Sequence, residues 1–310
     1  MREKIFFCVN LKRFDVPRSL GGLCPEEDPA AWIRTVIHDS IECGLDRREG
    51  LEVVYFVPEA LLSSALEARK AAGAAAGLQV GCQGIYRLDV EKGGNFGAMT
   101  AQRPAASVTA LGCGHALIAH SEERREKQSI MAFYDGAIES DEEKKLQAIE
   151  AVDRISGKEA ERALRRGMKI VYCIGETEEQ KGSEVFEEYA PRVRRVLQQQ
   201  IAVGLGGMKE LVGPENVTLG YEPVWAIGPG KKTPDGDYIR FVSDYIHSVC
   251  RQLLGKELPV IYGGGVKAEN AAEISGVESV SGGLVALTKF TQPVGFSVEE
   301  LDRIIRKFMA

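Results

Sequence analysis

Four polar residues stand at the ends of short apolar runs: Asn10, Lys12, His120 and Glu222. A positioned, desolvated carboxylate can remove a carbon-bound proton, an imidazole can move protons between oxygens, and a lysine can stabilise developing negative charge. Asn10 and Lys12 are two positions apart, so their side chains lie on one face of an extended segment. A lysine in a site is costly to desolvate without an anion, which predicts a partner for Lys12, either a substrate or Glu122.

Glu222 is predicted to lie at a strand tip, in front of a segment suited to move. The preceding run Val217–Tyr221 is short and apolar, as expected for a strand buried on both faces, and Pro223 prevents a smooth continuation into a helix. Gly228 and Gly230 follow, and glycines can absorb the large backbone changes of a hinge. The pattern predicts a base beneath a mobile loop.

Composition limits the class of protein. The chain has 310 residues, 44% of them apolar and 27% charged, which is enough to bury a large core. Its net charge of -6, with acids and bases interspersed, argues against a nucleic-acid surface or a polybasic membrane anchor. The sequence shows no signal-peptide pattern after Met1 and no apolar run long enough to span a membrane. Seven cysteines without a Cys-x-x-Cys pair favour reduced thiols, no zinc site and a cytoplasmic location.

The order of apolar runs predicts the fold. Eight strand-like runs alternate with helical segments, which is the pattern of a closed parallel α/β barrel, here a single domain over residues 1–310. A doubly wound open sheet is the alternative, but no Gly-x-Gly-x-x-Gly turn follows the first run. The expected strands are 5–10, 51–57, 78–83, 115–120, 169–174, 217–222, 258–262 and 279–285, and the expected helices include 30–42, 58–76, 183–203, 236–254 and 297–308.

Two segments are longer than a plain barrel requires. Between the fourth and fifth strands, 126–166 reads as an inserted helical segment, with charged helices over 139–157 and 158–167 separated at a glycine. It is either a solvated elaboration of the outer surface or a support for a subunit contact or substrate loop. The second segment, 14–29, carries three prolines and paired glycines and is expected to be a loop at the active-site end.

Five motifs, in family order, resemble those of the triosephosphate isomerase family: Val9–Lys12, Ala119–Glu122, Cys173–Glu176, Tyr221–Lys231 and Tyr262–Val266. The resemblance implies a TIM barrel and a homodimer. It also implies a cofactor-independent, metal-independent aldose–ketose isomerase that interconverts glyceraldehyde 3-phosphate and dihydroxyacetone phosphate through an enediolate.

The resemblance also implies roles for single residues. Glu222 would be the base, His120 the proton shuttle that polarises the carbonyl, and Lys12 the charge that stabilises the enediolate. A helix beginning at Ser121 would keep the His120 ring neutral, because a helix N-terminus disfavours a cation. Asn10 would bind substrate.

Other positions would support the site or pack around it. Glu122, Cys173 and Glu176 would lie behind the catalytic groups, and Trp225 and Tyr262 would pack the moving loop.

The expected phosphate site departs from the family pattern. Backbone amides of Gly228 and Gly265 would bind phosphate, but Gly265 replaces a serine, and Ala286 and Leu287 replace two glycines of the eighth strand's end. Lys289 is a hypothetical replacement anchor for the anion.

Further departures lie outside the phosphate loops. Leu11 replaces a tryptophan, Gly84 an asparagine and Glu123 an arginine, so a salt bridge made by that arginine would be lost, with Arg124 or Arg125 as candidates to compensate. Phe96 replaces a threonine in the loop expected to reach a second subunit.

Three functions stay open at this point. The intact set of catalytic candidates favours a triosephosphate isomerase, whereas the altered phosphate loops and the insertions favour an isomerase of a four-carbon sugar phosphate such as erythrulose phosphate. A catalytically silent barrel that serves as a binding protein would be expected to lack the base or the histidine. Four histidines without a ligand cluster argue against a metal-dependent aldolase or isomerase.

Overall fold

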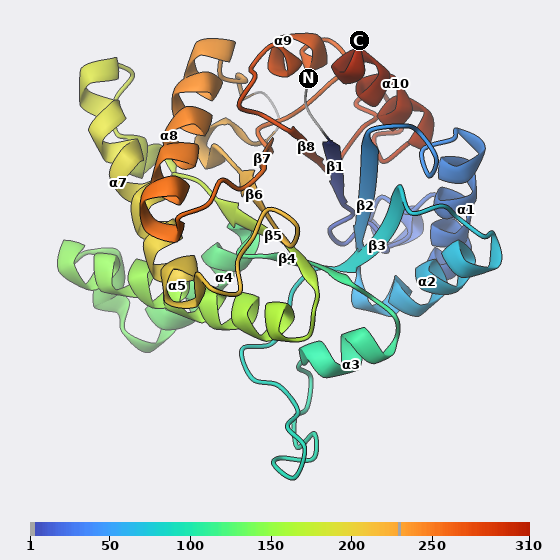
Figure 1. Cartoon of the computed structure of the whole chain (residues 1–310), viewed down its shortest axis with the longest axis horizontal. Helices are drawn as coiled ribbons and strands as arrows, with labels where there is room; N and C mark the ends of the chain where they lie inside the picture. The colour runs from blue at the N-terminus through green and yellow to red at the C-terminus, as the bar shows by residue number, and fades with distance from the viewer. Residues whose placement is uncertain (1–3, 229–230) are drawn as a thin grey trace.

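The structure is a computed structural model that describes residues 4–228 and 231–310. Within these residues, eight parallel strands close into a barrel in chain order, and β8 pairs with β1 (Figure 1). The predicted (β/α)8 barrel is confirmed. The strands are β1 Ile5–Asn10, β2 Leu51–Val57, β3 Leu78–Cys82, β4 His115–Ile118, β5 Lys169–Ile174, β6 Val217–Tyr221, β7 Val260–Tyr262 and β8 Gly282–Val285.

Helices surround the barrel, and several begin at a residue that caps them. The side chains of Asp28, Asp141, Asp235 and Ser297 accept backbone N–H groups at the starts of α1, α5, α8 and α10, which satisfies donors that the helix itself leaves free. The helices are α1 Pro29–Glu42, α2 Leu62–Ala71, α3 Ala105–Ala110, α4 Ser121–Tyr134, α5 Glu142–Arg165, α6 Glu178–Lys181, α7 Phe186–Leu205, α8 Gly236–Leu254, α9 Ala271–Ser275 and α10 Val298–Met309. Short 3-10 turns are η1 Arg18–Leu20, η2 Glu59–Leu61, η3 Gly136–Glu139, η4 Gly206–Met208 and η5 Val224–Ala226.

The strands are apolar on both faces because they separate two cores. The larger core lies between strands and helices, and a smaller one, which includes Phe56, Leu117 and Ile261, fills the barrel. Every residue of β2 is buried. Polar side chains are therefore concentrated at the strand ends, where a site can form.

The prediction of two helices over 139–157 and 158–167 is wrong. A single helix, α5, runs through Gly157. A Cβ atom built on Gly157 would lie 2.6 Å from the carbonyl oxygen of Gly204, so glycine permits α5 and α7 to pack closely. The gain from this packing offsets the cost of glycine inside a helix, about 0.5–1 kcal/mol.

The two parts of the inserted segment differ in burial. No residue of α4, which the structure describes completely, is buried, as expected for a solvated elaboration. In contrast, α5 buries one face, including Val152 and Ala160, and belongs to the helical layer of the barrel. The loop between β3 and α3 projects from the barrel, and its residue Phe96 is 86% exposed (Figure 1). We call residues 83–104 the β3–α3 arm.

The segment 14–29 is a loop with one 3-10 turn, Arg18–Leu20, before α1. Among the described residues, no helix combines the length and apolar character needed to cross a bilayer.

Candidate active site

The catalytic candidates converge at one end of the barrel. Asn10 is the last residue of β1, and Lys12, His120 and Glu222 closely follow β1, β4 and β6. Because the strands are parallel, their carboxyl ends lie at the same face. Residues separated by more than a hundred positions in the sequence therefore share one site.

Glu222 and His120 are in direct contact. The Nε2 atom of His120 lies 3.0 Å from Oε1 of Glu222. The carboxylate also accepts the backbone N–H of Ser121 at 3.0 Å, and the Ser121 hydroxyl at 3.4 Å. Glu222 is 3% exposed. The carboxylate is thus desolvated and held at the start of α4.

The two residues shift each other's protonation. Burial would raise the pKa of Glu222, but the charge and hydrogen bond of His120 and the Ser121 amide outweigh it and lower that pKa. Burial would lower the pKa of His120, but the Glu222 carboxylate outweighs it and raises that pKa. Both shifts favour an ionised Glu222 beside its histidine partner.

The helix start selects the tautomer of His120. Its Nδ1 accepts the backbone N–H of Glu122 at 3.2 Å, and a nitrogen that accepts a hydrogen bond carries no proton of its own. This hydrogen bond favours the neutral tautomer with its proton on Nε2, which donates to Glu222. The Glu222 carboxylate favours a second proton on the His120 ring, whereas the backbone N–H of Glu122 opposes a proton on Nδ1. Protonation of Nδ1 would break its hydrogen bond from the Glu122 amide.

Lys12 has the anionic partner that the sequence suggested. Its Nζ lies 2.7 Å from Oε1 of Glu122. The Asn10 side chain accepts the Lys12 backbone N–H at 2.9 Å and the Gln83 amide at 3.1 Å. Gln83 also donates to the carbonyls of Lys12 and Phe56, which ties β1, β2 and β3 together. Sequence analysis did not assign Gln83 a role, although its place at the end of β3 was a signal.

Glu176 anchors the segment that follows Glu222. It is fully buried, and its Oε1 accepts hydrogen bonds from Tyr221, Trp225 and Tyr238 at 2.9, 2.7 and 2.8 Å. Burial raises the pKa of Glu176 despite these three donors. The residue holds β6, η5 and α8 together behind the site.

Cys173 and Lys181 also contact this region. Burial, followed by the charge of Glu222, raises the pKa of the buried Cys173 thiol, which packs behind the carboxylate as an inert group. The Nζ of Lys181, which sequence analysis did not identify, lies 4.1 Å from the centroid of the Trp225 ring.

The residues predicted to bind phosphate lie in the segments that follow β6, β7 and β8. Gly228 and Gly265 have φ values of 126° and 97°, a conformation in which glycine is favoured. Ala286 and Leu287 pack against the barrel core. Lys289 lines a separate cavity of about 320 Å³ with Lys267 and other residues. The predicted hinge residue Gly230 lies outside the described residues.

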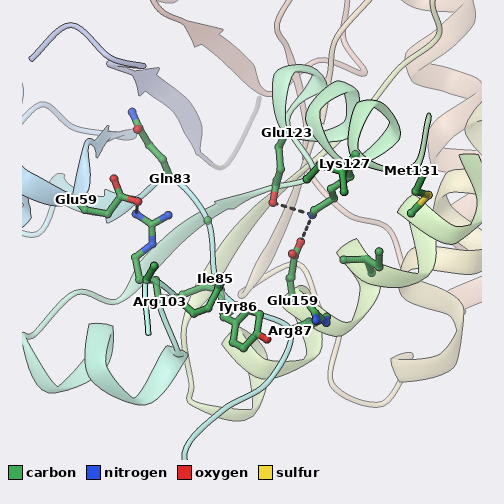
Figure 2. Close-up of a pocket in the computed structure, with 15 residues that line it drawn as sticks. Glu59, Gln83, Ile85, Tyr86, Arg87, Arg103, Glu123, Lys127, Met131 and Glu159 are labelled. Atoms are coloured by element: carbon green, nitrogen blue, oxygen red, sulfur yellow. Dashed lines mark hydrogen bonds and ion pairs between the residues drawn. The ribbon is translucent and has the colours of Figure 1, made fainter. Parts of the chain in front are cut away.

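A cavity of about 600 Å³ adjoins the site, between the β3–α3 arm and helices α4 and α5 (Figure 2). The cavity is lined by Gln83, whose side chain binds Asn10, and by Arg103. A cluster of three charged residues, Glu123, Lys127 and Glu159, also lines it. In this cluster Lys127 lies between Glu123 and Glu159 (Figure 2).

Comparison with known families decides which family the chain belongs to. A model of the family described as "Triosephosphate isomerase" matches residues 34–293. The chain belongs to the triosephosphate isomerase family. It is 32% identical over 241 residues to triosephosphate isomerase of Nitratidesulfovibrio vulgaris strain DSM 19637, covering 76% of this chain and 79% of that protein. It is 33% identical over 243 residues to that of Ruegeria sp. strain TM1040, covering 77% and 80%.

The fold of the family is also found by structure. The crystal structure of triosephosphate isomerase from Bartonella henselae superposes with a TM-score of 0.66 over 100% of both chains, at 23% sequence identity. At this identity, the likeness concerns the fold alone. Membership of the isomerase family therefore rests on the sequence matches.

Proposed function

We propose that the chain is an aldose–ketose isomerase of a small phosphorylated sugar, acting without a cofactor or metal. The observation that carries the proposal is the contact between His120 Nε2 and the buried Glu222 carboxylate at the barrel's carboxyl end, where Lys12 follows β1. A buried, ionised carboxylate is suited to remove a carbon-bound proton.

In the proposed mechanism, substrate binding breaks the contact between His120 and Glu222. The Nε2–H of His120 then donates a hydrogen bond to the substrate's carbonyl oxygen, and Glu222 removes the proton from the neighbouring carbon. Negative charge develops on the enediolate oxygens, and the positive charge of Lys12 stabilises it. Glu222 returns the proton to the adjacent carbon, while His120 transfers a proton between the two oxygens.

The first candidate substrate pair is glyceraldehyde 3-phosphate and dihydroxyacetone phosphate, in keeping with the family. An erythrulose phosphate is the second candidate, because Ala286 and Leu287 stand where backbone glycines would admit a phosphate closely, and Gly265 lacks a hydroxyl. We propose Asn10, Gly228 and Gly265 as substrate-binding residues and Lys289 as a phosphate anchor. If Lys289→Ala changes neither KM nor kcat, Lys289 has no such role.

The experiment is a comparison of kcat/KM for glyceraldehyde 3-phosphate and for D- and L-erythrulose phosphates. Glu222→Gln controls for contaminating isomerase and should lose roughly 10²-fold or more in kcat. A triose value near about 10⁷–10⁸ M⁻¹s⁻¹ supports the triose substrate. A much lower triose value with rapid turnover of a four-carbon phosphate supports the alternative, and no turnover of any of them contradicts the proposed function.

We also propose that the protein is a cytoplasmic homodimer in which the β3–α3 arm contacts the second copy. The exposed Phe96 side chain on the arm supports this proposal. Phe96→Asp should shift the protein toward monomer in sedimentation, whereas Val185→Asp, at a side chain that is 51% exposed, should not. An unchanged dimer after Phe96→Asp would remove the arm from the interface.

A further inference from the structure

The residue before His120 has an unusual backbone conformation. Ala119 has φ +63°, in the left-handed region that residues with a Cβ rarely adopt. This peptide links β4 to α4 and determines where the His120 ring points. A strained residue persists only where its surroundings hold it, so the groups that bind Ala119 matter for the histidine.

Two consecutive residues of α4 bind the Ala119 backbone. Oε2 of Glu123 accepts the Ala119 N–H at 2.7 Å, and Nε of Arg124 donates to the Ala119 carbonyl at 2.9 Å. The contact of Glu123 resembles half of a capping box, in which a glutamate in the first turn reaches back to a backbone amide before the helix. The N–H and the carbonyl group of Ala119 are thus both bound by side chains of α4, the helix that His120 caps.

Glu123 is itself held from the cavity side. Its Oε1 lies 2.8 Å from Nζ of Lys127, one turn along α4, and Lys127 also contacts Glu159 of α5 at 2.5 Å (Figure 2). Burial, followed by the charge of Glu123, raises the pKa of Glu159 to about 8. Because Glu159 holds a proton more readily than an ordinary glutamate does, it leaves more of the Lys127 charge to Glu123.

Gly84 leaves room for this arrangement. A Cβ atom built there would lie 3.9 Å from Oε1 of Glu123 and 3.5 Å from Nη2 of Arg103. A longer side chain at this position would enter the space that the two groups occupy. The sequence analysis treated Glu123 only as the loss of a salt bridge, whereas the structure places its carboxylate in contact with the backbone next to the active site.

We propose that Glu123 is a positioning residue for His120, because its carboxylate holds Ala119 in the left-handed conformation that directs the imidazole toward Glu222. Glu123 touches no reacting group, so it acts through the Ala119 backbone. The inference rests on the proposed function, in which His120 transfers protons to the substrate.

A double-mutant cycle tests the inference. Glu123→Met keeps the length of the side chain but removes the acceptor, and Ala119→Gly removes the strain that the acceptor offsets. In the Ala119 background, Glu123→Met should lower kcat by roughly 10- to 100-fold with little change in KM, because a small misplacement of a catalytic group has effects of this size. In the Ala119→Gly background, where the left-handed conformation is no longer strained, the same change should lower kcat clearly less.

Two further variants separate positioning from other effects. Glu123→Gln keeps an acceptor for the Ala119 N–H and should retain most of the kcat. Glu126→Ala, at an exposed position on the same helix, should leave kcat unchanged. Equal losses of kcat from Glu123→Met in both backgrounds would overturn the inference. A Glu123→Met protein with a lower melting temperature but an unchanged kcat would also overturn it.

One readout does not depend on turnover. In the ligand-free protein, the ¹⁵N resonances of the His120 ring should shift in Glu123→Met and stay in place in Glu126→Ala. If the wild-type protein turns over none of the sugar phosphates, the proposed function fails while these resonances still decide the role of Glu123. Unshifted His120 resonances in Glu123→Met would refute it.

Discussion

Trp225 donates its indole N–H to Glu176, with 2.7 Å between Nε1 and Oε1. Tyr221 and Tyr238 donate to the same oxygen, while Oε2 has no hydrogen-bond partner among the described residues. A single buried carboxylate oxygen therefore joins β6, the strand that precedes Glu222, to the turn that follows Glu222. The position of the proposed base depends on this contact as well as on its own hydrogen bonds.

Glu176→Gln should destabilise the protein and loosen Trp225. The amide is a weaker acceptor and brings an NH₂ group into a buried site, which we expect to lower the free energy of unfolding by about 1–3 kcal/mol. Urea unfolding measures the loss, and fluorescence in a Trp32→Phe background reports on Trp225 alone. The matched control is Glu178→Gln, whose side chain is 80% exposed and which should change little. Equal behaviour of the two variants would contradict the anchoring role.

Lys12→Met should reduce catalysis more than it reduces stability. The side chain keeps most of its volume but no longer supplies charge to an anionic intermediate, so we expect kcat to fall by roughly 10²- to 10³-fold. Arg13→Met, next in the chain and 61% exposed, serves as the control in the same steady-state assay. A Lys12→Met enzyme with near-normal kcat would show that its pairing with Glu122 is structural only.

Stability should depend on pH through Glu159. Burial raises the pKa of Glu159 from its usual 4.5 to about 8 in the folded protein, so the folded state binds a proton that the unfolded state has released. Its contribution to stability is complete below the unfolded pKa and is lost as pH rises through the folded pKa. Glu159→Gln stays neutral throughout. Its unfolding free energy relative to wild type should therefore increase between about pH 5 and about pH 9.

Urea unfolding at several pH values measures this difference. Glu161→Gln, on the same helix in a surface pair with Arg165, is the control and should show no such trend. A difference between Glu159→Gln and wild type that stays constant with pH would mean that Glu159 is ionised in the folded protein.

Gly157→Ala should be destabilising even though alanine favours helices. The added methyl group meets the Gly204 carbonyl, so α5 and α7 must separate, at a cost of about 1–3 kcal/mol, before the gain in helix propensity of about 1 kcal/mol. Gly136→Ala, where an added Cβ meets nothing within 4 Å, provides the comparison. A stabilised Gly157→Ala protein would show that close packing does not require this glycine.

The sequence by itself determined the order of the strands, the places of helices such as α1, α8 and α10, and the family motifs. These features depend on residues close together in the chain, such as the period of apolar residues and a proline after a strand. For this reason the boundaries of α8, Gly236–Leu254, were predicted correctly. The same local signals misled at Gly157, because glycine breaks a helix by its own propensity, whereas its contact with Gly204 lies on another helix.

Only the tertiary structure decided which side chains meet. The tie between Gln83 and Asn10, the stacking of Lys181 on Trp225 and the binding of Ala119 by Glu123 depend on backbone paths and side-chain directions. The first two join residues more than forty positions apart, and the third depends on the left-handed conformation of Ala119, which sequence analysis did not predict. Residue types can predict the chemistry of a site, but the shifted pKa values and fixed orientations arise from burial and contact, which exist only once the barrel has closed.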